Sequence, residues 1–535
     1  MPPPKPLAMT RTLVRRTLDR LDSGANRLYG WRFNPLYQSG TLVVVALAVM
    51  LVTGLYLLLF YRIGAPFESV GRITDQVWGG RWIRSAHRYA ADLAVAAAAV
   101  HALRMFAQGR SWGPRTLAWV SGLVLVFLLY VCGWTGYVMI WDTQALLLAA
   151  EGARLLDALP IFSAPIARAF SGEAPPPSAF FFLNLFLHIA VPIGMIGALW
   201  LHVSRVARPV LLPPRGLLWS TVGVLVAVSV LWPITMDPPA DLLALPGETT
   251  LDLFYGFWLP LARRVPAGWV WASALAGGAA LILVPFLTRP PADRRPLPSV
   301  VDARQCTGCE QCYVDCPYDA IRMVPRDDGR GYLLASVDPA LCVSCGICAG
   351  SCAPMGVGPP DRNGRDQLEA VRAFIDRDMK TVDGAMPQVV VVACAQSAFG
   401  RGAPGGGRGP GGLEPAVPRF DVSCAGNLHS SVVEFLTRAG AAGVLVSACP
   451  PRDCWNREGP IWLRERLFND REAELKERVD KRRVRTVHAG GAEPRAANAA
   501  LGAFRADLDA LDAPAPETAI EMNLECELTG PEALR

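Results

Sequence analysis

The sequence predicts a multi-domain protein in which a bundle of six membrane-spanning helices precedes an α+β domain and a small α/β domain. Long apolar runs occupy the first 290 residues, whereas all but one of the 14 cysteines follow them. Four of the six histidines lie inside the apolar runs. At 535 residues, with 52% hydrophobic residues and a mean hydropathy of +0.27, the chain is too apolar to be wholly soluble and too long for one domain.

Each apolar run is long enough to cross a bilayer. The runs are residues 39–60, 86–107, 115–141, 179–205, 216–235 and 268–288. Six spans place both ends of the chain on the same side, and arginines gather next to that side of the spans. The positive-inside rule therefore predicts cytoplasmic termini. These arginines are Arg11, Arg15, Arg16, Arg20, Arg110, Arg115, Arg205, Arg208, Arg215, Arg289, Arg294 and Arg295.

The formal charge of +5 is explained by these flanking arginines, so we expect no nucleic-acid partner. The proline-rich start and the basic stretch after it do not lead into a short apolar region with a cleavage site. We therefore expect no cleavable signal peptide, a cytoplasmic N-terminal segment over residues 1–38, and a multi-pass protein of the cell inner membrane.

The histidines in the apolar runs form two pairs, His87/His101 and His188/His202, each 14 residues apart. Fourteen helical residues rise about 21 Å and return to nearly the same face. Two parallel helices would thus place His87 opposite His188 and His101 opposite His202, each pair able to ligate a haem iron from both sides. The alternative is that they are ordinary buried residues, but histidine within a span is costly and usually functional.

Glycines repeat the same spacing in two other spans. Gly40 and Gly54 are 14 residues apart, as are Gly122 and Gly136. Since glycine lacks a Cβ atom, these positions give a bulky macrocycle room at each histidine level. Glycine is also a common helix-packing residue in membranes, which is the alternative interpretation.

Residues 25–290 resemble the cytochrome b of quinol-oxidising bc-type complexes, closest to the short form. The likeness lies in Arg-Ser-Ala-His-Arg-Tyr from Arg84, in His101-Ala-Leu-Arg, and in Gly-Tyr-Val-Met-Ile-Trp-Asp ending at Asp142. It implies a cytochrome b-like transmembrane domain over residues 39–290 with two b haems. It also implies that Arg84 and Arg104 pair with haem propionates, whereas an interfacial snorkelling role is the alternative.

Two departures from that family affect the expected chemistry. Gln38 stands where the photosynthetic short form has a cysteine that holds an extra haem, so we expect no third haem. The segment from Asp237 to Phe254 resembles the family's quinol-site region, with Leu-Asp-Leu-Phe in place of Pro-Glu-Trp-Tyr. We expect Asp252 to be the proton acceptor there, with its pKa raised by desolvation; an ordinary loop acid is the alternative.

The strongest motif in the sequence is a repeated cysteine pattern, Cys-x-x-Cys-x-x-Cys-x-x-x-Cys. Three close thiolates hold one cubane, and the fourth reaches the other cluster of a two-cluster ferredoxin. The pattern resembles bacterial ferredoxins and predicts a ferredoxin-like domain with two [4Fe-4S] clusters over residues 299–360. The first cluster is assigned to Cys306, Cys309, Cys312 and Cys352, and the second to Cys342, Cys345, Cys348 and Cys316. Zinc is a poor fit to this exchanged pattern.

Beyond a connecting helix at 365–380, strands at 388–394, 420–424 and 443–449 alternate with helical patterns at 428–439 and 459–478. This alternation predicts an α/β domain whose strand ends converge. Four cysteines follow the strands and suit a [2Fe-2S] centre, with structural zinc as the alternative. They are Cys394, Cys424, Cys449 and Cys454.

Ser-Cys-Ala-Gly at 423–426 and Ala-Cys-Pro-Pro-Arg-Asp-Cys at 448–454 resemble the delta iron-sulfur subunit of methyl viologen-reducing hydrogenases. The likeness covers 386–512, after which residues 513–535 form a tail. That subunit exchanges electrons with a heterodisulfide reductase flavoprotein. Ser397 stands near the first cysteine, where the family carries an additional cysteine.

Together these features predict an electron-transfer subunit of a quinone-linked oxidoreductase. We expect quinone or quinol as one partner and a cytoplasmic flavoprotein of the heterodisulfide reductase or NAD(P)H-dependent type as the other. A homodimer through the cytochrome b-like region is a further expectation. The alternatives are a non-catalytic redox sensor or assembly scaffold, and the same relay with quinone reacting at the cytoplasmic haem.

Overall fold

The computed structural model describes residues 6–160, 165–170, 176–204, 206–243, 252–379, 387–400, 413–414 and 417–512. Arg205, Leu251 and the tail at 513–535 therefore lie outside the described residues. The chain divides into two compact units. The first is Met1–Pro298 with Cys316–Arg322 and Ser336–Ser344, and the second is Ser299–Asp315, Met323–Ala335 and Cys345–Arg535.

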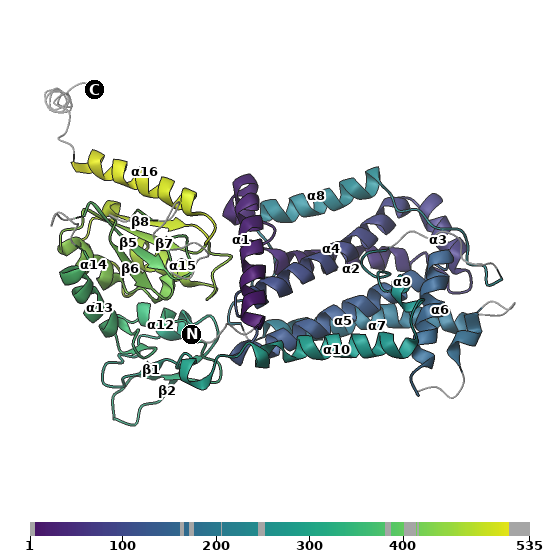
Figure 1. Ribbon diagram of the computed structural model, residues 1–535, viewed down its shortest axis with the longest axis horizontal. Helices are drawn as coiled ribbons and strands as arrows, with labels where there is room; N and C mark the ends of the chain where they lie inside the picture. The colour runs from purple at the N-terminus through teal and green to yellow at the C-terminus, as the bar shows by residue number, and fades with distance from the viewer. Residues whose placement is uncertain are drawn as a thin grey trace, which may run out of the picture. The chain divides into compact units, whose positions relative to one another are not determined.

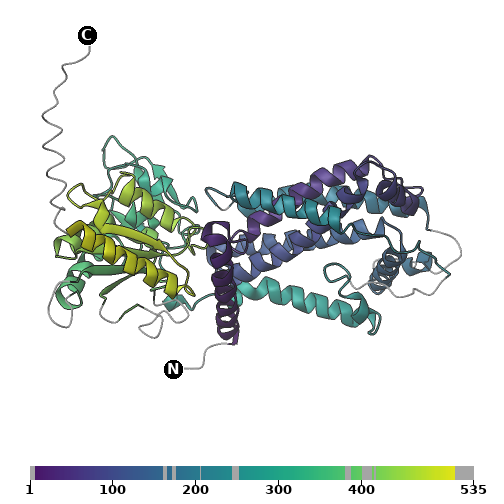
Figure 2. The ribbon, with the colours of Figure 1, turned by 90° about the horizontal axis from the view of Figure 1, so that it is seen from above.

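The first unit is a helical bundle (Figure 1). Its long helices are α1 (Pro6–Phe33), α2 (Ser39–Leu58), α4 (Gly80–Ala107), α5 (Thr116–Val138), α7 (Ser178–Val203), α8 (Arg215–Leu231) and α10 (Ala267–Leu287). Between them lie α3 (Pro66–Asp75), η1 (Gly113–Arg115), α6 (Thr143–Asp157), η2 (Ile166–Phe170), α9 (Leu259–Ala262) and η3 (Ala292–Arg294). The N-terminal helix α1 crosses the ends of the spans, as both views show (Figures 1 and 2).

Within the described residues, five helices are long and apolar enough to cross a membrane: α2, α4, α5 with the preceding η1 turn, α7 and α10. The fifth predicted span corresponds to α8, an apolar helix of 17 residues. At 1.5 Å per residue, α8 is about 26 Å long, which is at the short end of the range for a span.

The bundle is built on two helix pairs, α2 with α4 and α5 with α7. Small side chains line the first pair, where Ala46, Ala90 and Ala94 are fully buried. Without a hydrophobic driving force between helices in lipid, such small residues let the backbones approach closely. The two pairs thereby bring the glycine-bearing helices against the histidine-bearing ones.

The cysteine-rich region from residue 299 onward has short elements, as expected for a chain organised around metal centres. They are β1 (Val300–Val301), α11 (Gln311–Val314), β2 (Ile321–Val324), β3 (Leu334–Val337), α12 (Ile347–Gly350) and β4 (Val357–Gly358). β1 pairs antiparallel with β4, and β2 pairs with β3. Helix α13 (Gly364–Arg377) follows and begins at a capping box formed by Asn363 and Asp366.

The C-terminal domain is a four-stranded parallel sheet with the order β6-β5-β7-β8. Its elements are β5 (Val389–Cys394), β6 (Arg419–Val422), η4 (Ala425–Asn427), α14 (Ser430–Arg438), β7 (Gly443–Ala448), α15 (Gly459–Phe468), η5 (Lys481–Arg483), β8 (Val484–His488) and α16 (Pro494–Asp512). Alternate residues of β5 face opposite layers: Val391 packs with Phe504 of α16, and Val392 packs in the cluster that contains α14 and α15. This α/β domain confirms the predicted alternation, but the helix predicted at 459–478 ends at Phe468. The domain also contains β8 and α16, which the sequence analysis missed.

Candidate functional site

The four histidines of the apolar runs form two facing pairs. Helix α4 carries His87 and His101, and α7 carries His188 and His202. The ring centroids of His87 and His188 are 6.2 Å apart, and those of His101 and His202 are 6.4 Å apart. A metal ion between two imidazoles, with metal–nitrogen bonds of about 2 Å, requires ring centres roughly 6 Å apart. The predicted pairing is confirmed, and its spacing suits an axially ligated haem iron.

Hydrogen bonds fix the tautomer of three of these rings. Thr53 donates its hydroxyl to the Val49 carbonyl, at 2.6 Å, so it accepts from Nδ1 of His87, at 2.9 Å. Nδ1 of His188 donates to the Cys132 carbonyl at 2.9 Å. With Nδ1 protonated, the lone pair resides on Nε2, which is the nitrogen available to a metal.

The third ring, His202, has its Nδ1 3.1 Å from the Ser121 hydroxyl, which also reaches the Ala118 carbonyl. Each of these partners lies on the helix paired with the histidine-bearing helix. Such outer hydrogen bonds hold a ligand ring in orientation and raise its basicity. The sequence analysis did not identify Thr53, Ser121 or Cys132. Thr53 and Ser121 directly precede the repeated glycines Gly54 and Gly122, which was the available signal, whereas Cys132 contributes only its backbone carbonyl.

The repeated glycines lie directly against the histidines. A Cβ atom at Gly136 would be 2.8 Å from the ring of His188, and one at Gly40 would be 3.0 Å from the ring of His101. Gly54 and Gly122 stand in the same relation to His87 and His202, at 3.1 and 3.2 Å. The expected reason for these glycines was space for a macrocycle, whereas the nearest group in the structure is the imidazole itself.

The two arginines expected at haem propionates are both buried, and both have protein partners. Arg84 donates to the Ile234 carbonyl at 2.9 Å and to the Thr235 carbonyl at 3.3 Å. Arg104 donates from Nη1 to both carboxylate oxygens of Asp22, each at 2.8 Å. Pairing with propionates remains a prediction, and for Arg104 it requires sharing the guanidinium with Asp22.

Asp252 lies just before α9 and forms an ion pair with Arg88 of α4. The Tyr137 hydroxyl donates to the same carboxylate oxygen, and the backbone N–H of Phe254 donates to the other at 2.7 Å. Burial raises the pKa of Asp252, but the bonds from Tyr137, the Tyr255 N–H and Arg88 together outweigh it and lower the pKa to about 2. The expectation of a raised pKa was therefore wrong, because desolvation was considered without these donors.

Arg88 is the centre of this cluster. Its guanidinium also pairs with Asp92, one helical turn along α4, at 3.2 Å, and stacks 4.4 Å over the Tyr137 ring. Arg88 follows His87 directly in the sequence, so the cluster belongs to the His87/His188 level. The sequence analysis missed Arg88 and Asp92, although an Arg and an Asp four residues apart inside an apolar run are the signal that identifies them.

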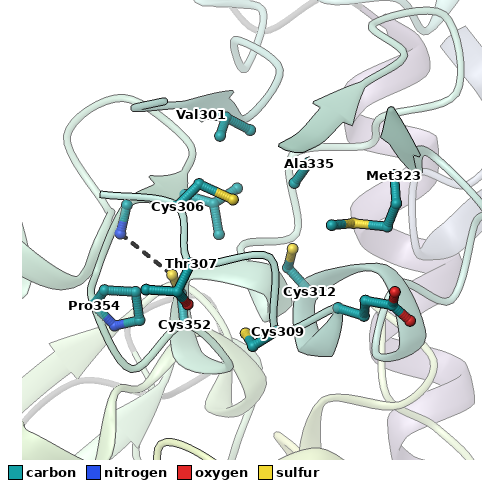
Figure 3. A pocket seen from close by; sticks show the side chains of 12 residues that line it. Val301, Cys306, Thr307, Cys309, Cys312, Met323, Ala335, Cys352 and Pro354 are labelled. Atoms are coloured by element: carbon teal, nitrogen blue, oxygen red, sulfur yellow. Dashed lines mark hydrogen bonds between the residues drawn. The ribbon is translucent and has the colours of Figure 1, made fainter. Parts of the chain in front are cut away.

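In the ferredoxin-like region, the four cysteines assigned to the first cluster line one pocket: Cys306, Cys309, Cys312 and Cys352. Figure 3 shows their sulfur atoms around a common space, with the Gly356 N–H bonded to the Cys352 sulfur at 3.2 Å. No three His, Cys, Asp or Glu side chains of the described residues converge on a single ion. A cubane binds each thiolate through a different iron, so this spread arrangement suits it.

Residues of the second predicted cluster show hydrogen bonds to sulfur. The Ala320 N–H donates to Cys316, and the Ser344 N–H donates to Cys342, both at 3.4 Å. The Ser299 hydroxyl lies 3.3 Å from the Cys348 sulfur. Hydrogen bonds to cluster sulfurs stabilise the thiolate charge and set the reduction potential.

The C-terminal cysteines lie at the carboxyl edge of the sheet and form two pairs. The sulfurs of Cys394 and Cys449 are 3.7 Å apart, and Cys424 bonds with Cys454. A bond from Cys454 lowers the pKa of Cys424 to about 6, and the partner thiols Cys449 and Cys454 have raised pKa values because each holds the shared proton. Two pairs match two irons with two thiolates each, as in a [2Fe-2S] centre.

Family models match the chain in three places. The model for cytochrome b/b6/petB matches residues 27–209, which include all four paired histidines. The cytochrome b6 of Heliobacterium mobile is 32% identical over 184 residues, covering 33% of this chain and 86% of that protein. The chain belongs to the cytochrome b/b6 family.

A second relative of this cytochrome b is the menaquinol:cytochrome c reductase cytochrome b subunit of Geobacillus thermodenitrificans. It is 27% identical over 177 residues, which cover 32% of this chain and 79% of that protein. Among solved structures, a chain of a hyperthermophilic respiratory Complex III aligns with 49% of this chain and 78% of its own length, at 18% identity and a TM-score of 0.38.

The other two matches extend the cytochrome b beyond its membrane part. A 4Fe-4S dicluster domain matches residues 305–356, and the methyl-viologen-reducing hydrogenase delta subunit matches residues 389–512. The predicted resemblances are therefore confirmed in their predicted order. Asp252, α8 and α10 lie outside the cytochrome b match. The role proposed for Asp252 therefore rests on its contacts in the structure and not on the family match.

Proposed function

We propose that this cytochrome b is the electron-transfer subunit of a quinone-linked oxidoreductase, fused to its own iron-sulfur relay. The single observation that carries the proposal is the pair of facing histidine couples at two levels of one helical bundle. When bound, two haems b, two [4Fe-4S] clusters and one [2Fe-2S] centre accept and release single electrons. Quinone is the proposed membrane partner because a relative is named a menaquinol:cytochrome c reductase subunit.

The protein's own residues have defined tasks in this proposal. His87 with His188, and His101 with His202, hold irons through Nε2, while neighbouring hydroxyls and carbonyls hold the rings. The cysteines of the ferredoxin-like region hold two cubanes, and the two C-terminal pairs hold the [2Fe-2S] centre. We assign the soluble substrate to a cytoplasmic flavoprotein partner, because residues 389–512 match the hydrogenase delta subunit.

Orientation and span number belong to the same proposal. With α8 as a sixth, short span, both ends of the cytochrome b bundle lie on one side. Because arginines flank that side, we assign it and the iron-sulfur domains to the cytoplasm. The His101/His202 level then faces the cytoplasm, and the His87/His188 level with Asp252 faces the opposite side. A homodimer through the bundle stays a prediction.

A second quinone position is favoured by one observation. At the His101 level, Arg104 pairs with Asp22, and the Tyr37 ring lies 4.8 Å from the Arg104 guanidinium. Asn26 bonds with Tyr37 at 3.0 Å and with Asn34 at 2.8 Å. This partly buried polar cluster supplies hydrogen-bonding groups of the kind that a quinone headgroup needs, so quinone chemistry at this level is the alternative to the Asp252 level.

Cofactor analysis of the purified full chain tests the proposal. We expect two non-covalent, low-spin b haems with bis-imidazole spectra, about twelve irons and about ten inorganic sulfides. A single haem, a covalently attached haem or an open-coordinate, high-spin haem would refute the histidine assignment. If the chain contains two fewer irons, two fewer sulfides and one zinc, the C-terminal cysteines hold structural zinc and not a [2Fe-2S] centre. That result would leave the histidine assignment unchanged.

A further inference from the structure

Arg466 of α15 is an unusual buried charge. Its side chain is 1% exposed, and it lies among residues of both the ferredoxin-like region and the C-terminal domain. Nη1 donates to the Ser351 hydroxyl at 2.9 Å, and Nη2 donates to the Gly426 carbonyl at 2.8 Å. A buried guanidinium is costly unless its charge and all its donors are satisfied.

The protein charges around Arg466 do not balance. Asp315 is its one carboxylate neighbour among the described contacts, 3.9 Å from Nη1, and Asp315 also pairs with Arg471 at 2.5 Å. Two arginines thus share a single buried carboxylate. In addition, Nε of Arg466 is buried without a hydrogen-bond partner in the described part of the chain. A further negative group is needed next to this guanidinium.

The contacts of Arg466 lie within three residues of three predicted metal ligands. Ser351 follows Cys348 by three residues and directly precedes Cys352, and Gly426 follows Cys424 by two. Burial lowers the pKa of Arg466 to about 10, and the negative charges of Asp315, Cys424 and Cys348 oppose that shift. Cys348 belongs to a predicted [4Fe-4S] cluster and Cys424 to the predicted [2Fe-2S] centre.

The two cysteine loops contact each other beside this side chain. A Cβ at Gly350 would be 2.6 Å from Nη2 of Arg466 and 2.6 Å from the Gly426 carbonyl oxygen. Asn427 also crosses the boundary, since it donates to the Gly346 carbonyl at 3.0 Å. The guanidinium is therefore held in one place relative to both loops.

We propose that Arg466 is a shared electrostatic element that sets the reduction potentials of both neighbouring centres and couples them. Each centre carries more negative charge when reduced, and a fixed cation beside both stabilises both reduced forms. An electron that leaves one centre is gained by the other, and the guanidinium stays next to the charge in either case. This inference rests on the proposed function, because it requires both centres.

Potentiometric titration of the full chain, followed by electron paramagnetic resonance, tests the proposal. In Arg466→Met, we expect the reduced-to-oxidised ratio of both centres at a fixed potential to fall about tenfold. This corresponds to a midpoint potential lower by about 59 mV for a one-electron centre. Arg466→Lys keeps the charge and should restore most of the shift. Arg471→Met is the matched control, because Arg471 binds the same Asp315 but is 24% exposed, and it should move either potential far less.

A shift at only one centre, or at neither, overturns the proposal. If Arg466→Met does not assemble its centres, Asp315→Asn decides, because loss of the compensating carboxylate should raise the potential of the Cys424 centre as well as that of the Cys348 cluster. An unchanged Cys424 centre in Asp315→Asn would overturn the proposal. If the wild-type chain lacks either centre by iron and sulfide content, the proposed function fails instead.

Discussion

Asp252 is ion-paired with Arg88, the residue that directly follows the haem-ligand candidate His87. The pair connects the segment before α9 to the His87/His188 level over a sequence separation of 164 residues. It also keeps Asp252 ionised at neutral pH, since the pKa is lowered to about 2. Proton uptake by Asp252 therefore competes with its bonds to Arg88 and Tyr137.

Asp252→Asn should slow quinone-linked electron transfer roughly a hundredfold with both haems retained, the usual scale for loss of a general base. Turnover with a water-soluble quinone, normalised to haem content, measures the effect. Asp241→Asn, at an exposed position in the segment between α8 and α9, is the matched control and should leave turnover unchanged. Unchanged turnover in Asp252→Asn, together with collapse in an Arg104 variant that keeps both haems, would move the quinone to the cytoplasmic level.

The same ion pair predicts a pH dependence of stability. Because the pKa of Asp252 is lowered in the folded protein, its contribution to stability is present above the pKa of an unfolded aspartate, about 3.9. That contribution is lost as pH falls toward 2. The difference in unfolding temperature between wild type and Asp252→Asn should thus be constant above about pH 5 and shrink between pH 4 and 2. A difference that grows on acidification contradicts the pairing.

Gly136→Ala should disturb the haem proposed between His87 and His188. The added Cβ would approach the His188 ring to 2.8 Å, so the ring must move and its bond to the Cys132 carbonyl must change. We expect a shifted low-spin spectrum or loss of one haem. Gly194→Ala, on the same helix as His188 but with no atom within 4 Å of the new Cβ, is the control. Equal spectra in both variants would show that this glycine does not support the ligand.

Cys352→Ser should perturb the cluster built on Cys306, Cys309 and Cys312, because all four sulfurs line one pocket. The companion variant Cys316→Ser should perturb the other [4Fe-4S] cluster. Electron paramagnetic resonance spectra of the two variants show which [4Fe-4S] cluster each substitution changes. The exchanged assignment fails if Cys352→Ser alters only the cluster held by Cys342, Cys345 and Cys348.

Periodic and motif-based features were predictable from sequence. The histidine spacing predicted the facing pairs, since helix geometry alone fixes which residues share a face. The cysteine repeat predicted one four-cysteine pocket, and valine-rich segments predicted β5 and β7. Helices α6 and α16 carry fewer apolar residues than a span or buried strand, and the sequence analysis passed over them.

Long-range electrostatics could not be predicted. The pKa of Asp252 depends on Arg88 and Tyr137, which lie 164 and 115 residues away in the sequence. The partner of Arg104 is Asp22 of α1, a helix within the N-terminal segment to which the sequence analysis assigned no secondary structure. Such contacts depend on how the helices pack, so they cannot be predicted from the residues that are adjacent in the sequence.

Reoxidation of the pre-reduced full chain by quinone tests the central claim most directly. In the wild type, rapid mixing should reoxidise the haems and, through them, the iron-sulfur centres. In His101→Ala, which should lack the cytoplasmic haem but retain the one at His87/His188, the remaining haem should reoxidise while the iron-sulfur centres stay reduced. Iron-sulfur centres that reoxidise at the wild-type rate in His101→Ala, or that never respond to quinone in the wild type, would contradict a relay through the two histidine levels.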